Sequence, residues 1–253
     1  MINKKKIILT LLILVFSFYY TNKVSEYIKS KDPIMIKIKK EKENYENKEI
    51  NAIIENDTII PGKKGRIVNI NKSYQKMKKL KSYSDSLYVY KFTDPKISIK
   101  NKYDKLIIKG NSYNKNISLI LKIKDIDLLY KIIKYPELNI ILDNYFINNY
   151  YNDLLNIKNN IIVLENNEIL DIIDYCYSVD NFKKLCSINN IYTISPTFID
   201  NDIYYNSYQI LENGKIFAYN VINEKDLEKV LLLLSGFKNL GYNIVSIDEL
   251  IEE

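Results

Sequence analysis

The chain has 253 residues, of which 47% are hydrophobic and 27% charged, and its formal net charge is +6. This composition is typical of a folded protein rather than a disordered one. Histidine is absent, which excludes a histidine general base, a histidine-activated serine or cysteine, and a histidine-ligated metal. Arg66 is the single arginine, so bidentate arginine clamps on phosphate are nearly excluded.

The N-terminus has the pattern of a signal-anchor. Residues 1–6 are basic, and residues 7–20 are an uncharged run with no Ala-x-Ala-like cleavage site after it. We therefore expect a transmembrane helix over residues 1–24, uncleaved rather than a cleaved signal peptide, although the run is shorter than the about 20 residues of a full span. The positive-inside rule places the rest of the chain outside the cytoplasm. The predicted location is the cell membrane, single-pass, or the exterior if the signal is cleaved.

Positive charge is concentrated in residues 3–6, 37–42 and 76–81. Such runs can bind nucleic acid or anionic lipid. The favoured interpretation is solvated lysine that keeps an isoleucine-rich protein soluble, in a composition typical of an AT-rich genome. An extracytoplasmic location argues against nucleic acid as a partner.

The middle of the chain is expected to form a stalk and a small unit. Residues 25–50 are polar and rich in lysine and glutamate, which indicates a partly helical stalk. Residues 51–115 are expected to form a mixed α+β unit. It would contain two strands about a Pro-Gly turn in 57–70, a helix over 72–81, and strands over 86–92 and 105–109.

From residue 116 to 253, short apolar strands alternate with helical stretches, which predicts an α/β domain with a parallel sheet, open or closed into a barrel. Asn223 is expected to cap the last long helix. The expected strands are 117–123, 139–142, 161–164, 172–176, 191–194, 215–219 and 243–246, and the expected helices are 126–134, 146–156, 179–189 and 224–239.

Two cysteines lie ten residues apart, Cys176 at the end of an expected strand and Cys186 near the far end of the next helix. A helix of that length carries the second sulfur roughly 15 Å away. That distance is too long for a disulfide, so two buried free thiols are expected.

The C-terminal region resembles a known family in the run Gly214-Lys-Ile-Phe-Ala-Tyr-Asn220 and, after a helix, in Gly241-Tyr-Asn-Ile-Val-Ser-Ile-Asp-Glu-Leu250. These pieces are similar to the end of a polysaccharide deacetylase domain, and residues 175–194 resemble an earlier strand pair of it. Pro61-Gly-Lys-Lys-Gly-Arg66 with Asn69-Ile-Asn-Lys-Ser-Tyr74 resembles the extension of membrane-anchored members from low-GC Gram-positive bacteria. The resemblance implies a deformed (β/α) barrel, complete or incomplete, that removes acetyl groups from cell-wall glycans.

The resemblance also implies that the family's chemistry is missing. Lys122 and Ile123 stand where the family has its two aspartates, Asp174 where it has a motif arginine, and Asn220 where it has a late histidine. The metal-binding His-x-x-x-His would fall near 159–166. A hydrolytic metal needs at least three protein ligands and a base for the water. The chain is therefore expected to be a pseudoenzyme with no catalytic residues, metal or cofactor.

Acidic and aromatic residues at the expected strand ends form a speculative ligand groove: Asp125, Asp143, Glu165, Asp174, Asp200 and Asp202 with Tyr177, and further tyrosines at 175, 204 and 205. Sugars bind such grooves by stacking on rings and by hydrogen bonds to carboxylates. The alternative for each acid is a helix N-cap.

Three functions remain open. The first is a non-catalytic, membrane-tethered envelope protein that holds cell-wall glycan. The second is a surface scaffold for a protein partner. The third is a glycan hydrolase with a rebuilt carboxylate-only site, since that chemistry needs no histidine.

Overall fold

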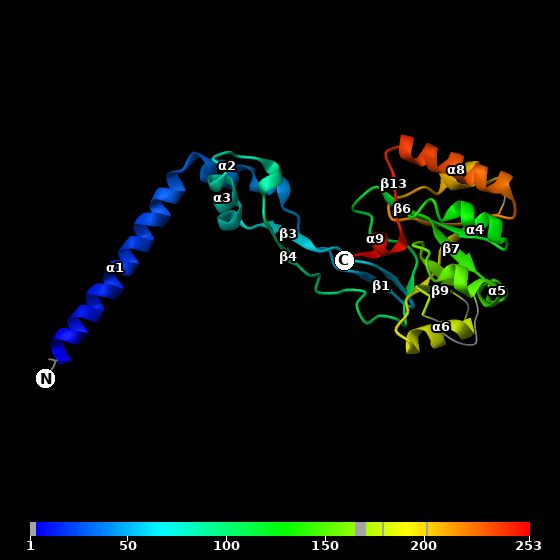
Figure 1. Ribbon diagram of the computed structural model, residues 1–253, viewed down its shortest axis with the longest axis horizontal. Helices are drawn as coiled ribbons and strands as arrows, with labels where there is room; N and C mark the ends of the chain where they lie inside the picture. The colour runs from blue at the N-terminus through cyan, green and yellow to red at the C-terminus, as the bar shows by residue number, and fades with distance from the viewer. Residues whose placement is uncertain (1–3, 165–170, 179, 201) are drawn as a thin grey trace. The chain divides into compact units, whose positions relative to one another are not determined.

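The computed structural model describes residues 4–164, 171–178, 180–200 and 202–253 (Figure 1). They form two compact units. Unit 1 joins Met1–Lys48 with Gly65–Thr93, and unit 2 joins Glu49–Lys64 with Asp94–Glu253.

Unit 1 is a small helical cluster with a two-stranded sheet. Its elements are α1 (Lys4–Lys31), α2 (Pro33–Glu41), η1 (Lys42–Tyr45), β3 (Gly65–Val68), α3 (Ile70–Lys79), η2 (Asp85–Leu87) and β4 (Tyr90–Thr93). Met35 and Ile38 of α2 pack against Tyr74 and Met77 of α3 in its core. Asp32 accepts a hydrogen bond from the Ile34 backbone N–H as the N-cap of α2, and it also pairs with Lys78 at 2.6 Å.

The expected transmembrane helix is not found. The apolar run 7–20 lies within α1, but within the described part of the chain no helix is long and apolar enough to cross a membrane.

Unit 2 is built on a parallel sheet with the strand order β1-β2-β5-β10-β9-β8-β7-β6-β12-β11, and β13 also pairs with β6. Only the β1–β2 pairing among these is antiparallel in the described residues. The strands are β1 (Ile53–Glu55), β2 (Thr58–Ile60), β5 (Leu106–Ile107), β6 (Asn116–Lys122), β7 (Asn139–Leu142), β8 (Ile161–Val163), β9 (Tyr175–Tyr177), β10 (Thr193–Ile194), β11 (Thr197–Ile199), β12 (Ile216–Asn220) and β13 (Asn243–Ile244). The expected α/β class with a parallel sheet is confirmed.

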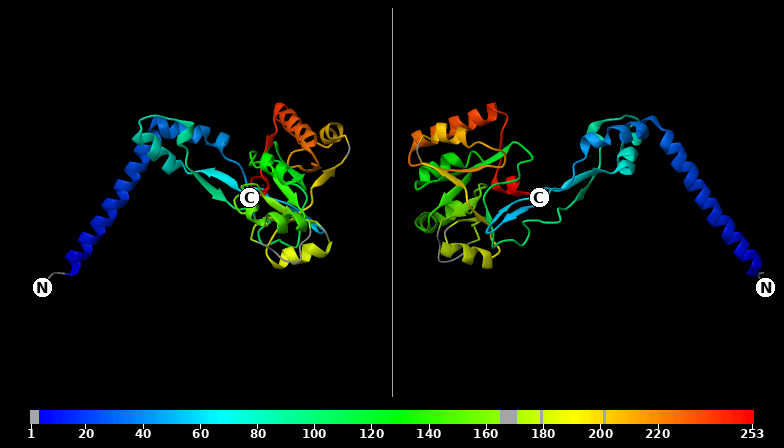
Figure 2. Two further views of the ribbon diagram at one scale, coloured as in Figure 1. Left: turned by 45° about the vertical axis from the view of Figure 1, so that its right-hand side comes forward. Right: turned by 180° about the vertical axis from the view of Figure 1, so that it is seen from behind.

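Each face of the sheet has its own apolar core. Leu119 and Leu121 of β6 face the helices, whereas Ile120 faces the other side, as strand alternation requires. The helices are α4 (Ile126–Ile132), α5 (Asn144–Leu154), α6 (Asp180–Ile188), α7 (Ile203–Gln209), α8 (Glu224–Asn239) and α9 (Ile247–Ile251). Figure 2 shows the sheet curled, with α4, α5 and α8 over the helix-covered face.

The two strands expected about the Pro-Gly turn both form, but they belong to different units. β2 pairs with β1 and β5 in unit 2, whereas β3 pairs with β4 in unit 1.

The expectation of two free thiols is wrong, because Cys176 and Cys186 form a disulfide with their Cα atoms 6.4 Å apart. β9 and β10 are parallel, so α6 between them must run back along β9. The C-terminal end of α6, which carries Cys186, therefore lies beside Cys176 rather than far from it. Both half-cystines are fully buried between sheet and helix.

Candidate functional site

The candidate site lies at the edge where the parallel strands of unit 2 end. Lys122, Tyr177 and Asn220 are the last residues of β6, β9 and β12. Lys122 and Asn220 are register partners, and alternation along each strand puts both on the face away from the helices. Their backbones are neighbours at the usual spacing of about 4.8 Å, so the two side chains leave the sheet from adjacent positions.

A carboxylate completes this group. The Asn220 side-chain Nδ2 donates a hydrogen bond to Asp200 Oδ1 at 2.5 Å. The Tyr177 ring meets Phe198 edge to face, with centroids 6.0 Å apart. Burial raises the pKa of Tyr177, and the negative charge of Asp200 raises it further. The phenol is therefore a neutral hydrogen-bonding group near Asp200.

A cleft of about 370 Å³ opens beside this group. Asp200, Asp202, Asn220 and Tyr204, all predicted groove or family positions, line it. Asp226 and Lys229 of α8 also line it, and the sequence did not single them out as site residues. Lys229 pairs with Asp226 at 3.4 Å, and Tyr204 donates to the Lys229 carbonyl at 3.2 Å. The only signal for Asp226 was its place in the first turn of a helix, which predicts dipole stabilisation and not a cleft.

Three of the predicted groove acids are helix caps. Asp125 accepts from the Asp127 N–H at 2.8 Å, Asp143 from the Phe146 N–H at 2.9 Å, and Asp202 from the Tyr205 N–H at 3.2 Å. Asp125 lines a separate hollow of about 530 Å³ between α4 and the start of α8. The capping alternative is thus observed at all three, and their part in ligand binding stays a prediction.

Asp174 and Tyr175 do not join the others. They lie at the beginning of β9, at the opposite edge of the sheet. Asp174 accepts from the Ile161 N–H at 2.7 Å, and partial burial raises its pKa. Tyr175 is buried, and its hydroxyl donates a hydrogen bond to Asp248. Burial first, and then this hydrogen bond, raise the pKa of Tyr175. Of the remaining predicted residues, Ile123 is buried in the core and Glu165 lies outside the described residues.

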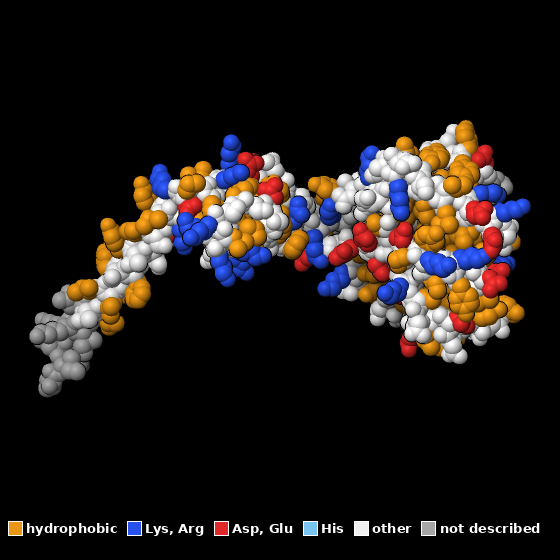
Figure 3. Space-filling view, turned by 45° about the horizontal axis from the view of Figure 1, so that its top comes forward, with side chains coloured by type: hydrophobic (Ala, Val, Ile, Leu, Met, Phe, Trp, Pro, Cys, Tyr) orange, Lys and Arg blue, Asp and Glu red, His pale blue; other side chains and the backbone are white. Residues whose placement is uncertain are grey.

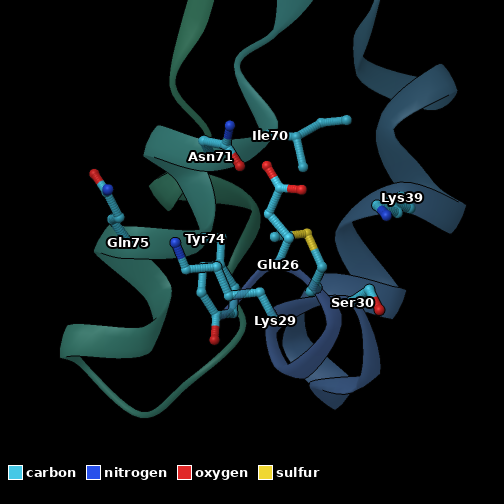
Figure 4. A pocket seen from close by; sticks show the side chains of 9 residues that line it. Glu26, Lys29, Ser30, Lys39, Ile70, Asn71, Tyr74 and Gln75 are labelled. Carbon is cyan, nitrogen blue, oxygen red and sulfur yellow. The ribbon is translucent and has the colours of Figure 1, made fainter. Parts of the chain in front are cut away.

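Unit 1 has a hollow of its own, of about 540 Å³, where α1, α2 and α3 meet (Figure 4). Glu26, Lys29 and Ser30 come from α1, Met35 and Lys39 from α2, and Ile70, Asn71, Tyr74 and Gln75 from α3. The lining mixes both charges, and no motif in the sequence indicated it.

No family model matches the sequence, and no curated protein matches it. Solved structures do match in fold. The wild-type BA3943, described as a CE4 family pseudoenzyme from Bacillus anthracis, is 18% identical with a TM-score of 0.66, over 88% of this chain and 96% of that chain. A BA3943 mutant described as having restored enzymatic activity gives 18% and 0.66, over 88% and 99%. The likeness shows that this chain shares the fold of the BA3943 structures over most of its length.

The residues at the strand ends do not fit the hydrolytic metal that this fold family implies. The sequence has no histidine. Lys122 and Ile123, which the resemblance aligns with the family's two aspartates, offer a cation and an apolar side chain rather than carboxylates. Among the described residues, no three cysteine or acidic side chains are grouped as a metal site. A lysine ammonium beside the site would also repel a divalent cation.

Proposed function

We propose that the chain is a non-catalytic relative of the polysaccharide deacetylases that binds cell-wall glycan at the strand-end edge of unit 2. The observation that supports the proposal is the pairing of Lys122 with Asn220 at the two neighbouring strand ends. In the resemblance, these positions belong to the base and the late histidine. An ammonium and an amide can hold hydrogen-bonding groups, but neither can activate water at neutral pH.

The surrounding groups suit a sugar. Tyr177 offers a half-buried ring and a neutral hydroxyl. Asp200 offers a hydrogen-bond acceptor and Asn220 a donor, and the two side chains are hydrogen-bonded to each other. Sugar rings stack on aromatic side chains, and their hydroxyl groups form hydrogen bonds with carboxylates and amides. The carboxylate-only hydrolase is less well supported, because Asp125, Asp143 and Asp202 are engaged as caps.

The test is co-sedimentation of the full chain with purified cell-wall sacculi over a salt series. Binding that survives high salt supports a specific glycan site, whereas binding that salt removes reflects attraction to wall polyanions. Tyr177→Ala and Asp200→Ala should each weaken binding about tenfold, by loss of about one stacking or hydrogen-bonding contact. The control is Tyr113→Ala, an exposed tyrosine that precedes β6 at the opposite edge.

A parallel assay of acetate release from acetylated chitooligosaccharide should give no signal above the no-protein background. Measurable turnover would contradict the non-catalytic part of the proposal but not the proposed glycan-binding site.

We also propose an extracytoplasmic, membrane-associated location. The disulfide supports an oxidising compartment. Fractionation of cells, with protease added to intact protoplasts, tests it: unit 2 should be cleaved, and protection from the protease would contradict the location.

A further inference from the structure

Charge is divided unequally between the two units. Unit 1 holds 18 Lys and Arg residues against 6 Asp and Glu, a formal charge of +12, whereas unit 2 holds 19 against 25, a formal charge of −6. A general enrichment in lysine would raise both units alike. It therefore does not explain opposite signs, and the earlier interpretation of solvated lysine is insufficient for unit 1.

The lysines of unit 1 stand on the outer surface of a packed helix pair. α2 and α3 bury their apolar faces against each other, so their lysines point outward. Figure 3 shows blue side chains over this part of the chain with few red ones. Lys78 is paired with Asp32, which leaves six exposed lysines on these helices: Lys37, Lys39 and Lys40 on α2, and Lys72, Lys76 and Lys79 on α3.

The same unit carries an exposed apolar segment. From Leu11 to Tyr20 in α1, the large apolar side chains are all at least half exposed, and Phe16 and Phe18 reach 73% and 70%. They occupy nearly consecutive positions, so they cover every side of the helix rather than one stripe. A soluble helix normally buries one such stripe, and a surface apolar all round suits hydrocarbon.

We propose that unit 1 docks on a lipid bilayer and is selective for anionic headgroups, which the lysines of α2 and α3 contact while the apolar segment of α1 enters the hydrocarbon. About ten residues of α1 separate Tyr20 from Ser30, a rise of about 15 Å, so the helix pair lies close to the surface that α1 enters. The negative charge of unit 2 is repelled by the same surface. Unit 2 is thereby left free of the lipid.

The test is flotation of the full chain with vesicles of phosphatidylcholine, with or without about a quarter phosphatidylglycerol. Wild type should bind the anionic vesicles more strongly, and rising salt should remove the difference. The triple change Lys72→Gln, Lys76→Gln, Lys79→Gln should weaken binding to anionic vesicles about 100-fold and leave binding to neutral ones unchanged. Glutamine keeps helix propensity, and far-UV circular dichroism checks the fold.

The matched control is Lys124→Gln, Lys158→Gln, Lys225→Gln, which removes the same charge from exposed positions in unit 2. It should bind anionic vesicles as wild type does. Equal weakening by both triples, or equal binding of wild type to both kinds of vesicle, would overturn the proposal. So would binding to soluble polyphosphate without binding to vesicles, or a dimer that buries α1 and leaves vesicles unbound.

Discussion

The side-chain Nδ2 of Asn160 donates a hydrogen bond to Oδ1 of Asn139 at 3.1 Å, in the buried interior of unit 2. Asn139 is fully buried, and its oxygen also accepts from the Ile247 N–H at 3.0 Å. Its Nδ2 donates to Ser118 Oγ at 2.8 Å and to the Leu119 carbonyl at 2.9 Å. Every hydrogen-bonding position of the Asn139 side chain is therefore used. This one residue joins β6, β7, the start of β8 and α9.

Asn139→Leu should lower the free energy of unfolding by about 2–6 kcal/mol. The leucine is similar in volume, but two buried donors, on Asn160 and Ile247, lose their acceptor at about 1–3 kcal/mol each. Urea unfolding followed by circular dichroism measures the change. The control is Asn152→Ala on the exposed face of α5, which should stay within about 0.5 kcal/mol of wild type. A similar loss for both would contradict the role given to Asn139.

Gly214→Ala should destabilise the chain by more than Gly241→Ala. Both glycines have φ of +81°, where a Cβ costs about 1–2 kcal/mol. At Gly214 a Cβ would also lie 2.4 Å from the Gly110 carbonyl oxygen, whereas at Gly241 it would meet only the Lys115 Nζ, at 3.9 Å. The difference in midpoint between the two variants in urea isolates the backbone clash. Equal midpoints would show that the backbone at Gly214 moves freely.

The double change Cys176→Ala, Cys186→Ala should cost about 2–3 kcal/mol, since a cross-link spanning ten residues restricts the unfolded chain by about that amount. A reducing agent should lower the melting temperature of wild type and leave the double variant unchanged. Two outcomes together would contradict the disulfide: a wild-type melting temperature that does not change with the reducing agent, and two free thiols titrated in the unfolded, unreduced protein.

Asp174→Asn should raise the melting temperature at pH 7 by a few degrees at most. In the folded chain, burial and then the nearby Asp248 charge raise the pKa of Asp174, against the hydrogen bond from Ile161. A carboxyl with a raised folded pKa favours folding when protonated, and that contribution is lost as pH rises through the folded pKa. The gain should therefore vanish near pH 3, where both side chains are neutral. A gain that persists at that pH would exclude ionisation as its cause.

Long, strongly patterned elements could be predicted from sequence. The expected bounds of β7 and α8 match the structure, and β6 differs by one residue at each end. Two short elements are missed: β11 is three residues next to Pro196, and α7 is seven residues rich in tyrosine, too short for a periodic pattern.

The same limit explains the candidate site. The family resemblance singles out Lys122 and Asn220, and the long apolar strands that they end are predicted to within one residue. Asp174 lies before its strand rather than near the strand end, because β9 begins at Tyr175, whereas the apolar Ile172 and Ile173 predict a strand over 172–176. The disulfide was missed because strand-to-strand packing, and not chain length along the helix, sets the distance between Cys176 and Cys186.

That cross-link also makes the stability of unit 2 depend on where the chain is made. In a reducing cytosol the two sulfurs stay as thiols, and the sheet edge that carries Tyr177 loses its one covalent tie to α6 among the described residues. Protein produced there and protein exported before folding would have the same sequence. They would differ in the stability of the sheet edge that carries Tyr177. The candidate glycan edge should therefore be studied only in oxidised material.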